Sequence, residues 1–458
     1  MKELRLSDLS YGVKGILHNE GTGEVIKGVS IDSRKVTEGD LFIAINGERM
    51  DGHDFIGEAI KNGCRAVMVH KDIEDTVKVP VVRVEDTLIA LHKMAAYYIS
   101  LFNIPKIAVT GSTGKTTTKE LIASVLSKKY KVIKNIGNYN NHIGLPLSVF
   151  NVEEKHEIAI FEMGMSSLGE IDLLASIIKP DVAVITNIGL SHIEHLKSQQ
   201  NILKAKMEVA NYFNHENVLI INFDDIWLKT LDKESFIYKL VKIGSDKESD
   251  YVIREISSSE EGINFTLTVN GNLYFLQMKV QGRHNAYNAA MAIGCGIHFK
   301  VDMKDMGKAI SEYEGYDMRL KTEKAQDGTI VLNDVYNASP DSMKAAIQTL
   351  TSIKGKRYIA ILSDMLEMGS FTEKYHKEIG DYAAEARLDL LITVGKFAEY
   401  IAIEADVKTK EMKILHFQDK KELLNSLDNL IMPGDVILVK GSRGMKMEEI
   451  VQHILERG

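Results

Sequence analysis

The sequence contains little cysteine, proline or tryptophan. Its 458 residues include 2 cysteines, 6 prolines and 1 tryptophan. Cys64 and Cys295 lie far apart and lack the spacing of a metal site, so we expect two buried thiols in a reducing compartment. Few prolines and no long polar tract leave little room for disordered linkers. These absences argue against a disulfide scaffold and a cysteine-based metal site.

Long apolar runs and basic blocks are also missing. The first residues, MKELRLSDLS, contain no apolar signal region, and no stretch approaches the roughly 18 apolar residues of a membrane span. The net charge of -8 argues against nucleic acid as the main partner. An anionic small ligand remains compatible with this charge, because helix N-termini and lysines bind phosphate locally. We therefore expect a cytoplasmic protein that acts on small molecules.

The length and the apolar content indicate several well-packed domains. A chain of 458 residues is too long for one hydrophobic core. Short strands and helical pieces fill residues 1–100, apolar strands alternate with helices in 101–315, and this alternation resumes in 316–458. Such alternation predicts mainly parallel sheets covered on both faces, with ligands at the carboxyl ends of the strands. The fold class is therefore α/β, with three α/β domains in series.

The strongest single motif is a glycine loop between the apolar strand KIAVTG and the helix TTTKELIASVLSKK. Its residues are Gly111, Ser112, Thr113, Gly114, Lys115, Thr116 and Thr117. Glycines allow backbone N–H groups to face an anion, and the helix adds its positive end. Lys115 can reach the β- and γ-phosphates, and the Thr116 hydroxyl can bind Mg²⁺. Val109 stands where the longer phosphate-loop pattern has glycine, so the shorter GxxGKT form fits and predicts nucleotide binding.

Two candidate metal ligands follow two of the expected strands. Glu162 ends the strand IAIFEMG, and His192 comes a few residues after VAVITNIG. Both are expected at the same sheet edge as the glycine loop, where they can hold Mg²⁺, although Mg²⁺ usually prefers oxygen ligands. The alternatives are a solvated glutamate and a structural histidine.

Lys206, in the helical segment ILKAKMEVA, has two interpretations. A lysine is ordinarily a surface charge, and beside a metal site it repels the ion. A neutral lysine amine can instead react with carbon dioxide and become a carboxylate on a long stem. That species attracts Mg²⁺.

Taken together, these motifs resemble the Mur ligase family. The matching segments are GSTGKTTTKE, FEMGMSSLGEI, TNIGLSHIEH and AKMEV. RHNAYNAAMA resembles the segment that contacts adenine, and DMR at 317–319 matches the place where an arginine enters the nucleotide site. The resemblance implies a central P-loop mononucleotide-binding parallel sheet and a Rossmann-like C-terminal domain.

The resemblance also implies cofactors and roles for individual residues. It implies ATP as a substrate, Mg²⁺ as cofactor and carbamylation of Lys206. ATP would be bound by the glycine loop with Asn285, Asn288, Arg319 and Asp334, and Mg²⁺ by Thr116, Glu162, His192 and Lys206. The catalytic candidates are Lys115, Lys206 and His192.

Within the family, the nearest resemblance is to ligases that add D-alanyl-D-alanine to UDP-N-acetylmuramoyl-tripeptide. IDSRKVTEGDLFIAINGERMDGHDFI resembles their uridine-nucleotide-binding domain, and NYNNHIGLPLSV their substrate loop. LNDVYNASPDSM, LSDMLEMGS and LVKGSRGMKME resemble their C-terminal signatures. The implied contacts are Ser33, Arg34, Asn140 and Asn141 for the UDP-substrate, and Tyr336 and Asn337 for the amine. Ser339 replaces the asparagine that more often precedes the proline, so no contact is assigned to it.

The resemblance implies a monomeric enzyme that activates a carboxylate as an acyl phosphate and joins it to an amine. One alternative is a folylpolyglutamate synthetase-like ligase, against which the segment DSRKVTEGDLFIAINGE argues. Another is a nucleotide-dependent switch ATPase, which would not need Glu162, His192 and Lys206 together. The sibling that adds the third amino acid usually carries a D-N-P-R motif, which this chain lacks. The identity of the third peptide residue stays open.

Overall fold

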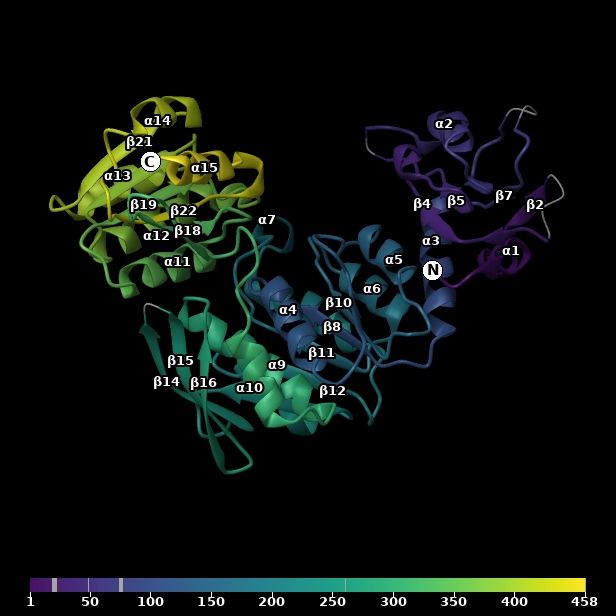
Figure 1. Ribbon diagram of the computed structural model, residues 1–458, viewed down its shortest axis with the longest axis horizontal. Coiled ribbons are helices and arrows are strands. Elements are labelled where there is room, and N and C mark those ends of the chain that lie inside the picture. The colour runs from purple at the N-terminus through teal and green to yellow at the C-terminus, as the bar shows by residue number, and fades with distance from the viewer. Residues whose placement is uncertain (19–22, 48, 74–76, 260, 458) are drawn as a thin grey trace.

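The computed structural model describes residues 1–18, 23–47, 49–73, 77–259 and 261–457. Glu48, inside the segment that resembles a uridine-nucleotide-binding domain, lies outside this description. The described residues form a small two-stranded sheet and three larger sheets. The larger sheets follow one another along the chain and define an N-terminal unit (β1 to α3), a central unit (β8 to α10) and a C-terminal unit (β17 to α15). The N-terminal and C-terminal units lie at opposite ends of the molecule, with the central unit between them (Figure 1).

The N-terminal unit contains a five-stranded sheet in the order β2-β7-β6-β5-β4. Strands β4 to β7 are parallel, and β2 is antiparallel to β7. The strands of the N-terminal unit, including β1 and β3 of the small two-stranded sheet, are β1 Leu4–Arg5, β2 Ile16–His18, β3 Val25–Ile26, β4 Gly28–Ser30, β5 Asp40–Ile43, β6 Ala66–Val69 and β7 Val81–Arg83. Its helices are α1 Leu6–Val13, α2 Ile56–Lys61 and α3 Thr87–Ser100. Strands and helices thus alternate in this unit, as in an α/β fold.

The segment VSIDSRKV, which we expect to be one strand, is a shorter strand followed by a turn of 3₁₀ helix. Strand β4 ends at Ser30, and the 3₁₀ helix covers Ser33–Lys35. The Asp32 carboxylate accepts a hydrogen bond from the Arg34 backbone N–H and so starts the 3₁₀ turn. This local side-chain hydrogen bond competes with strand pairing and ends the strand early.

Helix α3 connects the N-terminal unit to the central unit. Asp86 caps its first turn, accepting hydrogen bonds from the N–H groups of Leu88 and Ile89. The helix packs against α1 on one side and against α5 and α6 on the other. The buried Tyr98 hydroxyl accepts a hydrogen bond from the Lys2 backbone N–H at 2.6 Å and donates one to the Val152 carbonyl at 2.6 Å. Helix α3 therefore belongs to both units.

The central unit is built on a nine-stranded sheet in the order β16-β15-β14-β13-β12-β11-β8-β10-β9. The strands are β8 Lys106–Thr110, β9 Val132–Lys134, β10 Ile158–Glu162, β11 Val182–Ile185, β12 Val218–Asn222, β13 Lys239–Gly244, β14 Tyr251–Ser259, β15 Gly262–Val269 and β16 Asn272–Met278. The helices are α4 Lys115–Leu126, α5 Gly144–Val149, α6 Glu170–Ile178, α7 Ile193–Leu196, α8 Gln199–Met207, α9 Arg283–His298 and α10 Met303–Ser311. Strands β8 to β14 form the parallel part of this sheet.

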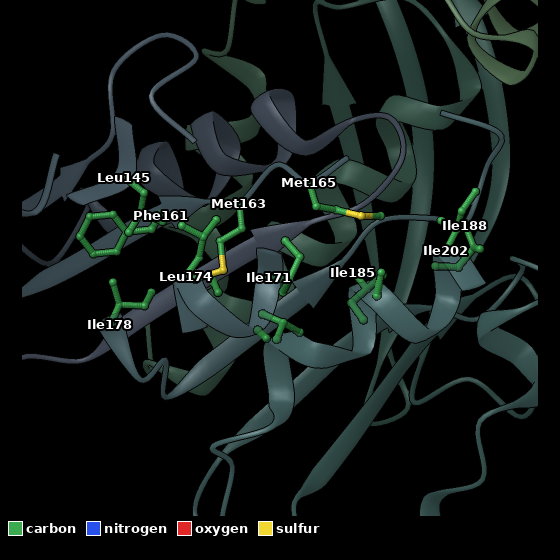
Figure 2. Packing of buried hydrophobic residues seen from close by; sticks show 14 of the residues in the cluster. Leu145, Phe161, Met163, Met165, Ile171, Leu174, Ile178, Ile185, Ile188 and Ile202 are labelled. Atoms are coloured by element: carbon green, nitrogen blue, oxygen red, sulfur yellow. The ribbon is translucent and has the colours of Figure 1, made fainter. Parts of the chain in front are cut away.

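Both faces of the central sheet are covered, as a parallel sheet requires. Along β8, Ile107 and Val109 pack in one core with α4 and α9, whereas Ala108 packs in the core on the opposite face. Figure 2 shows that opposite core, where Phe161 of β10 lies near Leu145 of α5 and Leu174 of α6. The strand ends that carry the glycine loop and Glu162 are thus fixed from both sides.

The parallel sheet expected for the central unit continues into an antiparallel part. Strands β14, β15 and β16 pair antiparallel at one edge of the sheet. Strands β15 and β16 are joined by Asn270 and Gly271, with φ values of +48° and +81°. An Asn-Gly pair with positive φ at both residues is typical of a tight hairpin turn. The sheet is therefore mixed.

The C-terminal unit contains a six-stranded sheet in the order β17-β18-β22-β19-β20-β21. All neighbours are parallel except the antiparallel edge strand β17. The strands are β17 Lys321–Lys324, β18 Ile330–Asp334, β19 Tyr358–Ser363, β20 Leu390–Val394, β21 Lys413–Phe417 and β22 Val436–Lys440. The helices are α11 Pro340–Ser352, α12 Thr372–Glu385, α13 Glu399–Lys408, α14 Lys420–Leu427 and α15 Glu448–Glu456. Across the described ranges, no helix combines the length and the apolar content needed to cross a bilayer.

Candidate active site

A cavity of about 530 Å³ lies between the central and C-terminal units. It opens where the parallel strands of both sheets end, the usual place for ligands in open α/β sheets. Most of the residues singled out from the sequence line it: Ser112, Thr113, Gly114, Lys115, Thr117, Asn140, Asn141, Glu162, His192, Asn285, Asn288, Arg319, Asp334, Tyr336 and Asn337. Gly111, Thr116 and Lys206 are not among the lining residues, and Ser33 and Arg34 belong to the N-terminal unit.

The glycine loop joins β8 to the N-terminus of α4. Gly114 precedes the helix with a φ of +78°, a conformation that favours glycine, and a Cβ at this position would lie 2.9 Å from Asn288 Oδ1. No side chain caps the first turn of α4 at this residue. The first backbone N–H groups of the helix therefore stay available to an anion, and the helix dipole favours negative charge there.

In this structure, Lys115 folds back on its own loop. Its Nζ donates hydrogen bonds to the carbonyls of Gly111 at 2.8 Å and Ser112 at 3.3 Å. Desolvation lowers the pKa of Lys115, Glu162 opposes this shift, and Arg319 adds to it. Throughout the described ranges, no carboxylate forms an ion pair with this ammonium group. A phosphate group would therefore provide the counter-charge that it lacks.

Glu162 connects the phosphate loop to the loop that precedes α5. Its Oε2 accepts a hydrogen bond from Thr116 Oγ1, and its Oε1 accepts one from Asn140 Nδ2, both at 2.8 Å. The Nζ of Lys119 lies 3.7 Å from Oε2. The Thr116 hydroxyl and the Glu162 carboxylate are oxygen donors of the kind that Mg²⁺ prefers, so this pair fits the cation implied by the family.

Sequence reasoning missed Lys119, which is fully buried. Besides Glu162, it contacts the Asn135 carbonyl at 3.0 Å and Glu120 Oε1 at 3.4 Å. A signal was present, because Lys119 precedes Ile122 by three residues and so falls on the apolar face of α4. A lysine on that face must be paired inside the protein.

The buried Lys206 lies near the end of α8. Burial lowers the pKa of this amine well below its ordinary value, and the positive charge of Lys115 lowers it further. In the part of the chain that the structure describes, no carboxylate pairs with it. The neutral amine, which burial favours, is the form that reacts with carbon dioxide. The site is therefore suited to carbamylation, which stays a prediction.

His192 faces the C-terminal unit. Its Nδ1 lies 2.8 Å from Glu367 Oε2, and both residues have positive φ values, +62° and +63°. Within the described residues, no group of three histidine, cysteine, aspartate or glutamate side chains is placed to hold a metal. Thr116 and Glu162 thus provide the oxygen donors of the predicted cation site. The participation of His192 stays a prediction.

The predicted adenine contacts lie against the phosphate loop. Asn288 accepts a hydrogen bond from Thr118 Oγ1 at 3.2 Å and donates one to Asn285 Oδ1 at 2.9 Å. Arg319 lies over the ring of Tyr336, 3.9 Å from its centroid, an arrangement typical of cation–π contact. Its buried Nε makes no hydrogen bond among the described residues and so remains free to donate to a ligand.

A buried lysine at the end of β22 organises the loop after β18. Lys440 Nζ donates to Asp334 Oδ2 at 2.5 Å and to the Asn337 carbonyl at 2.9 Å. The other Asp334 oxygen accepts from the Leu320 backbone N–H at 3.1 Å. Sequence reasoning missed Lys440, although its position after the apolar run VILV marks a polar side chain at a strand end.

The four candidate contacts for the UDP-substrate fall into two groups. Ser33 donates to Glu58 Oε2 at 2.5 Å, and Arg34 pairs with Asp32 at 2.8 Å, both in the N-terminal unit. Asn140 and Asn141 lie at the cavity. The Asn141 side chain accepts hydrogen bonds from the N–H groups at the start of α5, which is a structural role. The structure therefore does not bring these four residues together.

Comparison with known proteins covers nearly the whole chain. Residues 25–99, 109–296 and 318–443 match the family models described as "Mur ligase family, catalytic domain", "Mur ligase middle domain" and "Mur ligase, glutamate ligase domain". The chain is 41% identical over 454 residues to a UDP-N-acetylmuramoyl-tripeptide–D-alanyl-D-alanine ligase of Bacillus subtilis, covering 98% of each chain.

Two solved structures extend the comparison to three dimensions. A crystal structure of MurF from Acinetobacter baumannii superposes with a TM-score of 0.93 at 30% identity, over 100% of both chains. A MurF ligase from Thermotoga maritima in complex with ADP gives a TM-score of 0.84 at 28% identity, over 94% of this chain and 97% of that one. These matches agree with the cavity and its phosphate loop, and they show that the chain belongs to the Mur ligase family of ATP-dependent ligases.

Proposed function

We propose that this chain joins D-alanyl-D-alanine to UDP-N-acetylmuramoyl-tripeptide with consumption of ATP, the activity for which its relatives are named. The observation that carries the proposal is the grouping of Lys115, Thr116 and Glu162 at one cavity that Arg319 enters from the other unit. This grouping provides positive charge and oxygen donors where a triphosphate and a carboxylate must meet.

The chemistry explains why such a grouping is needed. A carboxylate is a poor electrophile and must be activated before an amine can attack it. Its oxygen attacks the γ-phosphorus of ATP, which forms an acyl phosphate and releases ADP. The amine then attacks the carbonyl carbon, and phosphate leaves as the peptide bond forms. Mg²⁺, when bound, would screen the negative charges that repel one another in the first step. Lys115 adds positive charge beside the same phosphates.

The protein residues have separate parts in this proposal. Thr116 and Glu162 would hold Mg²⁺, with His192 and the carbamate of Lys206 completing the set implied by the family. Asn285, Asn288, Arg319 and Asp334 would contact ATP. These assignments are supported by the residues that line one cavity and by the hydrogen bond from Thr116 to Glu162 in its lining.

The substrates would be distributed among three domains, for which we propose boundaries near residues 100 and 315. Ser33 and Arg34 would hold the uridine end, and Tyr336 and Asn337 would meet the dipeptide. We expect the enzyme to act as a monomer in the cytoplasm, and size-exclusion chromatography with light scattering tests the monomer.

The test combines the chain with ATP, Mg²⁺, D-alanyl-D-alanine and the tripeptide precursor. Two precursors, with lysine or diaminopimelate as third residue, distinguish the possibilities that the sequence leaves open. We expect phosphate release and a UDP-pentapeptide, detected by mass spectrometry. Lys115→Ala should lower kcat by about 10²- to 10³-fold, the scale found when a donor to developing negative charge is removed.

Lys128→Ala is the matched control, because Lys128 lies just beyond the same helix and pairs with Glu312 on the surface. It should retain full activity. Undiminished pentapeptide from Lys115→Ala would refute the assignment of that lysine. Turnover with folate and glutamate, or full ATP hydrolysis without an amine, would instead favour the alternative ligase or the switch ATPase.

A further inference from the structure

The segment around His192 is contacted by the C-terminal unit at three points. The Asp341 carboxylate accepts a hydrogen bond from the Leu190 backbone N–H at 2.8 Å. Gly369 lies directly against Glu194, since a Cβ on that glycine would be 2.8 Å from Glu194 Cγ. The contact between His192 and Glu367 lies between these two. The C-terminal unit therefore contacts this segment on both sides of His192, at the Leu190 backbone and at the Glu194 side chain.

The residues of the central contact have an unusual backbone. His192 and Glu367 both lie in the left-handed region, where side chains other than glycine, asparagine and aspartate are uncommon. Such conformations persist when the surrounding structure enforces them, and they gather at functional sites. Here two such residues from different units are in contact, with His192 Nδ1 2.8 Å from Glu367 Oε2.

The distance between His192 and Glu367 is that of a hydrogen bond, but the two groups are not aligned as a hydrogen bond requires. His192 Nδ1 is buried and makes no aligned hydrogen bond among the described residues, although Glu367 Oε2 is 2.8 Å away. Hydrogen bonds of a reacting site are often poorly aligned without substrates and tighten when these bind. A carboxylate accepts hydrogen bonds, so Glu367 offers the acceptor that Nδ1–H needs.

The effect of such a contact on a neutral imidazole is well defined. One ring nitrogen carries the proton and the other a lone pair, and the hydrogen bond of one nitrogen decides the state of the other. A carboxylate at Nδ1 holds the proton there and leaves the lone pair on Nε2. Histidines that ligate metals almost always donate their other N–H to a carboxylate or carbonyl in this manner.

We propose that Glu367 is a positioning residue that holds His192 as the Nδ1–H tautomer across the boundary between the central and C-terminal units. This inference rests on the proposed function, since the free Nε2 lone pair would serve the cation site at the cavity. Its consequence is that His192 is ready for its role only while the C-terminal unit is docked. The site is then completed by docking as well as by ligands.

The first test reads the tautomer directly and needs neither metal nor substrate. Ring ¹⁵N spectra of histidine-labelled protein are recorded above pH 8, and the His192 signals are those lost in His192→Gln. We expect the Nδ1–H pattern in the native chain. In Glu367→Ala it should change to the Nε2–H tautomer that imidazole favours in water, and Glu367→Gln, which keeps an acceptor oxygen, should lie between.

The second test measures Mn²⁺ affinity by electron paramagnetic resonance with a non-hydrolysable ATP analogue. Loss of a carboxylate that orients a ligating histidine lowers metal affinity by about 10- to 100-fold, and we expect a loss in that range for Glu367→Ala. Glu373→Gln is the matched control, because Glu373 is exposed on α12 and pairs with Lys377 one turn away. It should leave both the tautomer and the affinity unchanged.

A double-mutant cycle separates action through His192 from a merely structural role. If Glu367 acts through the imidazole, adding Glu367→Ala to His192→Gln costs no further affinity. Additive losses, or a native chain with the Nε2–H tautomer, would overturn the proposal. Failure of the proposed function would show differently, as absence of pentapeptide from a native chain whose tautomer still depends on Glu367.

Discussion

Three lysines at the candidate site are buried in the protein interior rather than solvated. Lys119 and Lys440 have oxygen partners at 3.0 Å or less, whereas Lys206 has no carboxylate partner among the described residues. A buried ammonium without a partner is costly, and the amine avoids that cost by giving up its proton. Lys206 is thus the lysine whose chemistry differs from that of the others.

Replacing Lys206 by arginine should abolish most activity. Arginine keeps the positive charge and much of the length, but it has no neutral amine to react with carbon dioxide. We expect kcat to fall by at least about tenfold, the scale set by loss of a metal-site residue. Steady-state rates at saturating substrates give the measurement, and ¹³C spectra with labelled bicarbonate should show a carbamate signal in the native chain but not in Lys206→Arg.

Lys204→Arg, on the same helix, is the matched control and should retain its activity and the carbamate signal. A fully active Lys206→Arg would exclude carbamylation as a requirement.

The sequence allowed the glycine loop, Glu162 and His192 to be placed at one sheet edge, because consecutive residues and strand ends carry that information. It did not reveal the partners of these residues. The contacts from Lys119 to Glu162 and from Glu367 to His192 join residues that are distant in sequence. They depend on how helices pack and units dock, which spacing alone does not encode.

At the scale of elements, the Tyr98 hydroxyl of helix α3 is hydrogen-bonded to both the N-terminal and the central unit. Burial raises the pKa of Tyr98 to about 12. The neutral phenol is therefore favoured by the folded state, and its contribution to stability is complete below about pH 10, the pKa of an unfolded tyrosine. It is lost as the pH rises from about 10 to about 12. This difference between the folded and unfolded pKa of Tyr98 corresponds to about 2–3 kcal/mol of stability.

Tyr98→Phe should destabilise the chain by about 1–3 kcal/mol at pH 8, because the Val152 carbonyl and the Lys2 N–H lose their partner. The difference from the native chain should shrink as the pH approaches 12. Urea unfolding at pH 8, 10 and 11.5 measures both effects. The exposed Tyr11, changed to phenylalanine, is the control. A difference that stays constant with pH would contradict the role given to Tyr98.

Prediction of the elements succeeded where one period dominates. Helix α3 covers Thr87–Ser100 in the part of the chain where helical pieces were expected, because its apolar residues follow helical spacing and Asp86 caps it. The antiparallel strands β14 to β16 were not predicted, since the regular alternation of strands and helices was extended through them. The Asn270–Gly271 pair marks that hairpin.

At the scale of the whole molecule, the cavity is lined by residues of two units. An acyl phosphate hydrolyses in water, so closure of the C-terminal unit over the site would protect it. We expect the radius of gyration from X-ray scattering to fall when an ATP analogue and the UDP-tripeptide are both present, and to fall less with either alone. No compaction with both ligands would count against closure.

The distance between Ser33–Arg34 and the cavity has a further consequence. If the nucleotide end of a precursor is held in the N-terminal unit, the reacting carboxylate must extend to Lys115 in the central unit. The protein would then select its substrate by the length between the nucleotide and the reacting carboxylate. A precursor that is one or two amino acids too short would occupy the first position and compete there, yet its acid group would never arrive beside the phosphates.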